Sequence, residues 1–162
     1  MTREATFQTI FESHYEKVFR LCKGYFIGDE AMAKDMAQEV FIRAWQHLEN
    51  FRNEAKISTW IYRIAVNTCL SEKRKAVYKR EKKSETFIEP AATADANEKE
   101  EQLNQLYKCI EKLSPLDKMI IMLVLEETTY EEISEVTGIK EASLRVRIHR
   151  IKKSLTHCVH HD

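Results

Sequence analysis

Residues 129–155, TYEEISEVTGIKEASLRVRIHRIKKSL, predict two short helices joined by a tight turn. Thr129 can cap the first helix, and Glu132, three residues later, can reach back to the backbone of the cap in a capping box. Gly138 favours the end of that helix, because a residue without Cβ adopts the left-handed conformation at no steric cost. The stretch therefore indicates a helical hairpin with a defined turn.

The second predicted helix is amphipathic and basic. Leu144, Ile148, Ile151 and Leu155 form one apolar stripe at helical spacing. Residues 140–153 hold six Lys/Arg against one Glu. The face left for a partner comprises Ala142, Ser143, Arg145, Val146, Arg147, His149, Arg150 and Lys153. This pattern is typical of a helix-turn-helix that lays its second helix in a DNA major groove, although an ordinary hairpin with a solvated basic face has the same spacing.

Composition limits the class of protein. The chain has 162 residues, 43% of them hydrophobic, with three Gly and two Pro, which predicts one or two mostly helical domains. No apolar run is long enough for a membrane span or a signal peptide, so we expect a cytoplasmic protein. The four cysteines are scattered without a C-x-x-C pair, which predicts reduced thiols in the core.

Charge is segregated although the formal net charge is zero. Residues 71–83 hold seven Lys/Arg and two Glu, whereas residues 85–101 hold six acids and one Lys. The acidic run includes Pro90 and few large apolar residues, which is typical of a linker. The expected fold is all-α, with two small helical bundles at 1–82 and 100–162 joined by a flexible acidic linker at 83–99.

A predicted helix from Asp29 to about residue 49 has more apolar surface than one buried stripe needs. Opposite its core stripe, apolar and charged side chains are mixed, at Asp35, Gln38, Glu39, Phe41, Ile42, Arg43 and Trp45. Apolar side chains rimmed by charge mark a protein interface. Alternatively, another helix of the same chain covers them.

The next predicted helix is capped by Ser58 and carries an outer line of Trp60, Arg63, Asn67 and Arg74. An aromatic ring, an amide and cations in a row suit an unpaired nucleic-acid strand, because bases stack on rings and cations hold phosphates. The alternative is that Trp60 is a core residue and Asn67 is merely solvated.

Two long segments resemble a known family. DEAMAKDMAQEVFIRAWQHLENFRNEAKISTWIYRIAVNTCLSEKRK, residues 29–75, closely resembles the second conserved domain of bacterial sigma factors of the extracytoplasmic-function group. LSPLDKMIIMLVLEETTYEEISEVTGIKEASLRVRIHRIKKSL, residues 113–155, resembles their fourth domain. The resemblance implies a promoter-specificity subunit that binds core RNA polymerase, recognises the −35 and −10 promoter elements and promotes DNA opening.

The resemblance also distributes roles along the chain. It implies that one set of residues binds the clamp helices of the largest polymerase subunit: Asp35, Gln38, Glu39, Phe41, Ile42, Arg43 and Trp45. A second set is implied to bind the −10 element, with Asn67 contacting a flipped-out base: Arg52, Asn53, Trp60, Arg63, Asn67, Lys73 and Arg74. A third set is implied to bind the −35 element: Lys140, Ser143, Arg145, Val146, Arg147, His149 and Arg150. Val146, His149 and Lys140 depart from the common family pattern, so the −35 sequence is not specified.

The resemblance also implies a regulatory partner, and the sequence leaves other functions to be considered. Members of this group are commonly held inactive by an anti-sigma factor, which can hold the sigma factor near a membrane. A helix-turn-helix repressor that dimerises through residues 38–45 is the competing class. No convergent acid, base and nucleophile set supports an enzyme, and no cofactor is implied. His157, Cys158, His160 and His161 could in principle bind zinc, but a short terminal tract lacks separated ligand pairs, so no metal site is predicted.

Overall fold

The computed structural model describes residues 2–80 and 98–161, with side chains described up to residue 72 in the first range. The elements are α1 (Arg3–Tyr25), α2 (Glu30–His47), the short 3-10 helix η1 (Leu48–Asn50), α3 (Ile57–Arg80), α4 (Glu98–Glu111), α5 (Pro115–Leu125), α6 (Tyr130–Thr137) and α7 (Glu141–His161). Within these ranges there is no strand, which confirms the all-α prediction. The predicted linker at 83–99 falls largely outside the described residues, and α4 already begins at Glu98.

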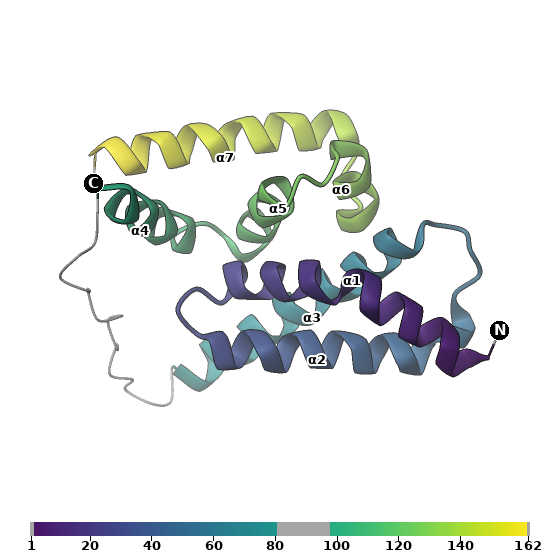
Figure 1. Ribbon diagram of the computed structural model, residues 1–162. Coiled ribbons are helices and arrows are strands. Elements are labelled where there is room, and N and C mark those ends of the chain that lie inside the picture. The colour runs from purple at the N-terminus through teal and green to yellow at the C-terminus, as the bar shows by residue number, and fades with distance from the viewer. Residues whose placement is uncertain (1, 81–97, 162) are drawn as a thin grey trace.

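Helices α1, α2 and α3 form an N-terminal unit in which α1 lies along α2 and α3 crosses both (Figure 1). Gly28 separates α1 from α2 and adopts a positive φ of 84°, which a residue without Cβ tolerates at no steric cost. Asp29 then caps α2, because its carboxylate accepts a hydrogen bond from the Met32 N–H at 2.9 Å. The predicted cap at Ser58 is wrong. The helix already begins at Ile57, and the Ser58 hydroxyl binds a different partner.

Helices α4 to α7 form the C-terminal unit. Ser114 caps α5 by accepting a hydrogen bond from the Asp117 N–H at 3.3 Å, and Pro115 lies in the first turn. Thr129 caps α6 by accepting the Glu132 N–H at 3.1 Å, and Gly138 ends α6 in the left-handed conformation with φ 79°. The Glu132 carboxylate, however, does not complete a capping box but accepts hydrogen bonds from α3.

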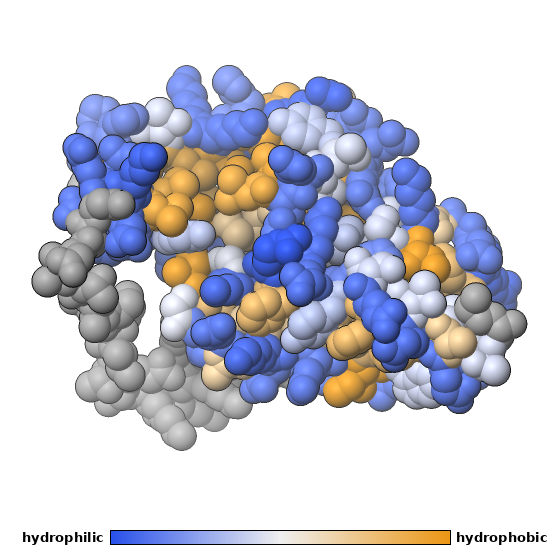
Figure 2. Space-filling model, in the orientation of Figure 1, coloured by the Kyte–Doolittle hydropathy of each residue, from blue (hydrophilic) through white to orange (hydrophobic). Residues whose placement is uncertain are grey.

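The apolar stripe of the last predicted helix is buried as expected. Leu144, Ile148, Ile151 and Leu155 of α7 lie in the core of the C-terminal unit. The basic side of α7 is left at the surface. Figure 2 shows the outer surface above α7 as largely hydrophilic, with apolar atoms gathered beneath the helix. The helical period therefore placed both faces of α7 correctly.

The two units pack directly on each other, with α5 against α1 and α6 against α3 (Figure 1). Buried residues of both units belong to one continuous apolar core. At the α1–α5 contact Gly24 faces Met122, and a Cβ at position 24 would overlap the Met122 sulfur. Beside it, the Lys118 ammonium group lies 5.3 Å from the centre of the Tyr25 ring. The sequence predicted two bundles but not this contact between them.

The cysteines correct one expectation. Cys109 of α4 and Cys158 of α7 form a disulfide, so the prediction of four reduced thiols is wrong for this pair. Cys22 and Cys69 are free and buried, with their sulfur atoms 3.7 Å apart. The hydrogen bond to Cys22, together with burial, raises the pKa of Cys69 well above its usual value. The Cys69 thiol is therefore less readily ionised than an exposed cysteine, which lowers its reactivity as a nucleophile.

Candidate nucleic-acid interface

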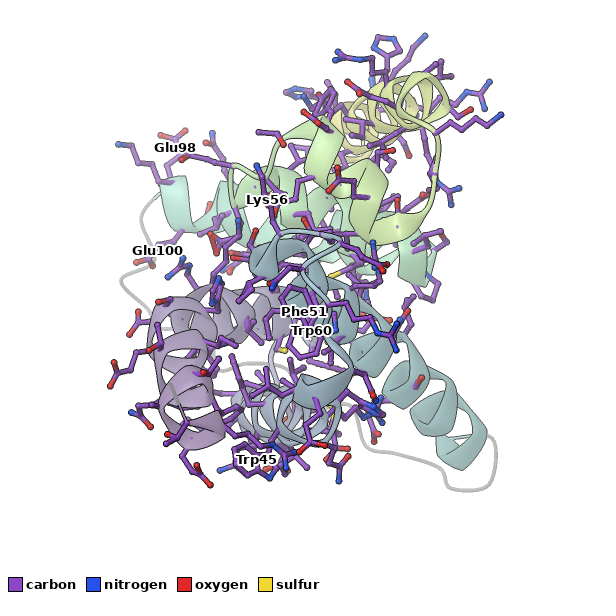
Figure 3. All side chains as sticks on the ribbon, turned by 90° about the vertical axis from the view of Figure 1, so that its right-hand side faces the viewer. Trp45, Phe51, Lys56, Trp60, Glu98 and Glu100 are labelled. Carbon is purple, nitrogen blue, oxygen red and sulfur yellow. A yellow bond between two sulfur atoms is a disulfide. The ribbon has the colours of Figure 1, made fainter. Side chains whose placement is uncertain are left out.

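A pocket opens where the segment after η1 meets the first turns of α3. Its volume is about 410 Å³, and its lining comprises Asn50, Phe51, Arg52, Glu54, Ala55, Trp60 and Arg63. Phe51 and Trp60 lie together in Figure 3, with ring centroids 5.0 Å apart and planes tilted by 37°. Trp60 is half-buried, so its ring is partly fixed by packing while part of it borders the pocket. An aromatic wall beside two arginines can accept a base and its phosphate.

The structure brings together three of the residues predicted for the −10 element, since Arg52, Trp60 and Arg63 all line this pocket. Asn53 lies in the same loop with a positive φ of 59°, and Asn67 is exposed further along α3. The side chains of Lys73 and Arg74 lie outside the described residues. Asn50 and Glu54 line the pocket but were not predicted as site residues. The available signal was their position in the sequence, because Asn50 and Glu54 flank the predicted site residues Arg52 and Asn53.

The face of α7 predicted for the −35 element is accessible. Val146 is 52% exposed, and Ser143, Arg145, His149 and Arg150 are exposed as well. Lys140 is exposed in the turn before the helix. A groove of about 640 Å³ runs along one side of this face and is lined in part by Ser143, Val146, Arg147 and Arg150. A small apolar side chain between cations leaves room for the helix to approach base edges closely.

Two arginines of α7 are held by neighbours. Arg145 donates a hydrogen bond to the Glu141 carboxylate at 2.8 Å, and its guanidinium lies 5.1 Å from the centre of the Tyr130 ring. Arg147 donates to the Asp117 carboxylate of α5 at 2.6 Å. Arg145 is thereby oriented on the exposed face, whereas Arg147 ties α7 to α5. If Arg147 contacts the −35 element as predicted, that contact competes with this ion pair.

The predicted polymerase-docking face of α2 is only partly a surface. Phe41 is 3% exposed and packs edge-on against Phe7 and Phe11, so the prediction that it contributes to an exposed protein interface is wrong. Trp45 is half-buried against Phe7, with the Arg3 guanidinium 4.1 Å from its ring centre. Helix α1 covers both residues, which is the alternative that the sequence left open.

The remaining members of that face are accessible. Ile42 is 50% exposed, Asp35 and Gln38 are exposed, and Arg43 pairs with Glu39 at 3.1 Å. A single large apolar side chain therefore stands among charged groups on this side of α2. This smaller set still fits a protein-binding surface.

The tail of α7 has fewer metal donors than its sequence offers. The rings of His157 and His161 lie 4.5 Å apart, while Cys158 is engaged in the disulfide. Among the described residues no group of three or more His, Cys, Asp or Glu is arranged to hold a metal ion. None of the described helices is long and apolar enough to cross a membrane.

Comparison with known proteins matches both units. Residues 10–77 match the Sigma-70 region 2 family and residues 103–155 match the Sigma-70, region 4 family. The chain is 30% identical to the ECF RNA polymerase sigma factor SigW of Bacillus subtilis, over 92% of this chain and 86% of that protein. It is 28% identical to the ECF RNA polymerase sigma-E factor of Escherichia coli, over 94% of this chain and 85% of that protein.

Solved structures share the fold. The sigma factor RpoE in complex with the anti-sigma factor NepR from Bartonella quintana superposes with a TM-score of 0.76, at 20% identity over 97% of this chain and 98% of RpoE. CnrH in complex with the cytosolic domain of CnrY gives a TM-score of 0.73, at 18% identity over 98% of this chain and 90% of CnrH.

The fold and the two matched regions thus define a protein of transcription initiation. The chain belongs to the extracytoplasmic-function group of the sigma-70 family, and it is an alternative sigma factor for promoter recognition and transcription initiation.

Proposed function

We propose that this chain binds core RNA polymerase through the exposed part of α2, and that it directs the enzyme to promoters with two separate surfaces. The exposed face of α7, with Arg145, Val146, His149 and Arg150, reads the −35 element. The Phe51/Trp60 pocket, with Arg63 and Asn67 on α3, takes up the −10 element as an unpaired strand. The observation that carries the proposal is the aromatic pocket bordered by arginines within the region that matches Sigma-70 region 2.

The proposal extends to partners and place of action. RpoE and CnrH were each solved with a protein bound, named as an anti-sigma factor in the first case. We infer an anti-sigma factor for this chain as well, and action in the cytoplasm. No catalytic or cofactor role is proposed, since a sigma factor acts by binding and positioning.

In vitro transcription with core polymerase on a randomised promoter library tests the proposal. We expect enriched templates to share two short elements at a fixed spacing, and transcription to require both the chain and the core enzyme. A helix-turn-helix repressor would instead bind duplex DNA as a dimer and would not start transcription. Absence of template selection by the polymerase complex would refute the proposal.

The first expected result concerns the −35 surface. Arg145→Ala should weaken promoter binding by the polymerase complex by about 1 to 3 kcal/mol, because an arginine can make two hydrogen bonds to one base. Folding should be nearly unaffected, because the Arg145 side chain is mostly exposed and its contacts with the Glu141 carboxylate and the Tyr130 ring lie at the protein surface. Binding is measured by fluorescence anisotropy on promoter DNA. Lys152→Ala, an exposed change on the same helix, is the control.

The second concerns promoter opening. Asn67→Ala should slow open-complex formation and relax base preference at one −10 position, because an amide offers both a donor and an acceptor to an unstacked base. A template already mismatched at that position should rescue most of the defect. Asn104→Ala, which changes an exposed asparagine of α4, should have no effect. An equal loss on duplex and mismatched templates, without altered preference, would contradict the role of Asn67.

A further inference from the structure

The two cysteine pairs of the chain differ in how far solvent can reach them. Cys22 and Cys69 are fully buried in the N-terminal unit. Cys109 of α4 is 2% exposed, whereas Cys158 is only half-buried and lies in the last turn of α7. The Cys109–Cys158 disulfide is therefore the pair that a small thiol or disulfide can approach from solvent, at the Cys158 sulfur.

The proposed place of action makes a permanent bond unexpected here. In the cytoplasm, glutathione and thioredoxin keep most protein thiols reduced. The disulfides that do form there are usually transient, and they serve catalysis or redox sensing. Neither cysteine lines the groove beside the −35 face or the Phe51/Trp60 pocket. A sensing role therefore fits this bond better than a direct role in binding DNA.

The bond links the helix of the proposed −35 surface to a weakly anchored helix. Helices α4 and α7 lie side by side (Figure 1), and the disulfide joins residues 49 apart in sequence. Ile110 is the other buried residue of α4, and Leu103 nearer its start is 49% exposed. A cross-link that closes so long a loop restricts the unfolded chain strongly. The C-terminal unit is therefore much less stable when the two cysteines are reduced.

A buried charge connects α4 to the helix beneath the −35 face. The Lys118 ammonium group of α5, on a side chain that is 1% exposed, pairs with the Glu111 carboxylate of α4 at 3.0 Å. Detachment of α4 removes this carboxylate, so the ammonium group must lose a buried partner or draw water into the core. Helix α5 in turn holds α7 through the ion pair between Asp117 and Arg147. Loosening of α4 thus weakens the support of α7.

We propose that Cys109 and Cys158 form a thiol-oxidation site that adjusts −35 recognition to the redox state of the cytoplasm. The inference rests on the proposed function, because it takes the exposed face of α7 as the −35 surface. In the reduced state both residues carry thiols, α4 is loosely held and the −35 element is bound weakly. Oxidation forms the sulfur–sulfur bond, fixes α4 against α7 and stabilises the −35 surface.

The oxidant is a low-molecular-weight disulfide, for which oxidised glutathione serves as the probe. The Cys158 thiolate attacks one sulfur of this disulfide, forms a mixed disulfide and releases one glutathione thiolate. The Cys109 thiolate then attacks the Cys158 sulfur, which forms the intramolecular bond and releases the second glutathione thiolate. The two protons lost by the protein thiols go to the two released thiolates, and the two electrons reduce oxidised glutathione. Reduced glutathione reverses both steps.

Transcription in a series of glutathione buffers tests the proposal. The full-length chain and core polymerase are equilibrated at stepped ratios of reduced to oxidised glutathione, and transcription is measured from a promoter selected from the randomised library. Alkylation of free thiols followed by peptide mass spectrometry gives the fraction of Cys109–Cys158 bond in the same samples. Cys158→Ser cannot form the bond, so this matched variant also reveals any redox effect on the polymerase itself.

We expect transcription to rise about tenfold from reduced to oxidised wild type in step with the fraction of bond, as for a competent state that falls to about one tenth on reduction. A template with a pre-opened −10 region and a scrambled −35 element should respond little, because it does not use α7. Cys158→Ser should stay at the reduced level in every buffer.

Transcription that does not follow the fraction of bond would overturn the proposal, and so would a bond that no glutathione ratio opens. An equal response from the template without a −35 element would also overturn it, because the effect would then not act through α7. Wild-type protein that starts no transcription in any buffer would instead refute the proposed function itself.

Discussion

Phe41→Ala is expected to lower the free energy of unfolding by about 3 to 5 kcal/mol, the usual cost of truncating a buried phenylalanine. The Phe41 ring packs against Phe7, Phe11 and Tyr15 of α1, so its removal leaves a cavity between α1 and α2. Urea unfolding followed by circular dichroism measures the change.

The neighbouring residue provides the control. Ile42 is 50% exposed, so Ile42→Ala should leave stability nearly unchanged and should weaken binding to core polymerase instead. Phe41 and Ile42 are thus expected to separate folding from docking on one helix. A Phe41→Ala protein of wild-type stability would show that the ring is not part of the core.

Reducing the Cys109–Cys158 disulfide is also expected to lower the stability of the protein strongly. The bond joins residues 49 apart in sequence, and a loop of that length constrains the unfolded chain by about 4 kcal/mol in the chain-entropy model. Helix α4 has few other anchors, since Cys109 and Ile110 are its buried residues. We therefore expect the C-terminal unit to lose stability on reduction, with α4 becoming accessible first.

The measurement is thermal unfolding with and without a phosphine reductant, combined with hydrogen exchange across α4. Cys158→Ser should reproduce the effect of reduction, because Cys158 is half-buried and the serine creates little additional strain. Reductant added to this variant should change nothing further. A wild-type melting temperature that is insensitive to reductant would contradict the expected contribution of the bond.

The sequence by itself determined the local structure. The caps at Asp29, Ser114 and Thr129 and the turn at Gly138 follow from hydrogen bonds and dihedral angles within a few residues. The buried stripe of α7 follows from the helical period alone. Because these causes are local, they could be predicted without knowing how the helices pack. The resemblance to sigma factors likewise depended on strings of residues rather than on packing.

Only the tertiary structure decided which partner each side chain meets. Helical spacing predicted both Phe41 and Ile42 on the side of α2 opposite its core stripe. In the structure, however, α1 covers Phe41 and leaves Ile42 exposed. In the same way, Glu132 had the spacing of a capping box, but its carboxylate accepts a hydrogen bond from Ser58, which is distant in sequence. Cys109 and Cys158 carried no pairing signal until α4 was packed against α7. A helix period fixes which residues share a face, whereas the element that covers this face depends on packing between distant segments.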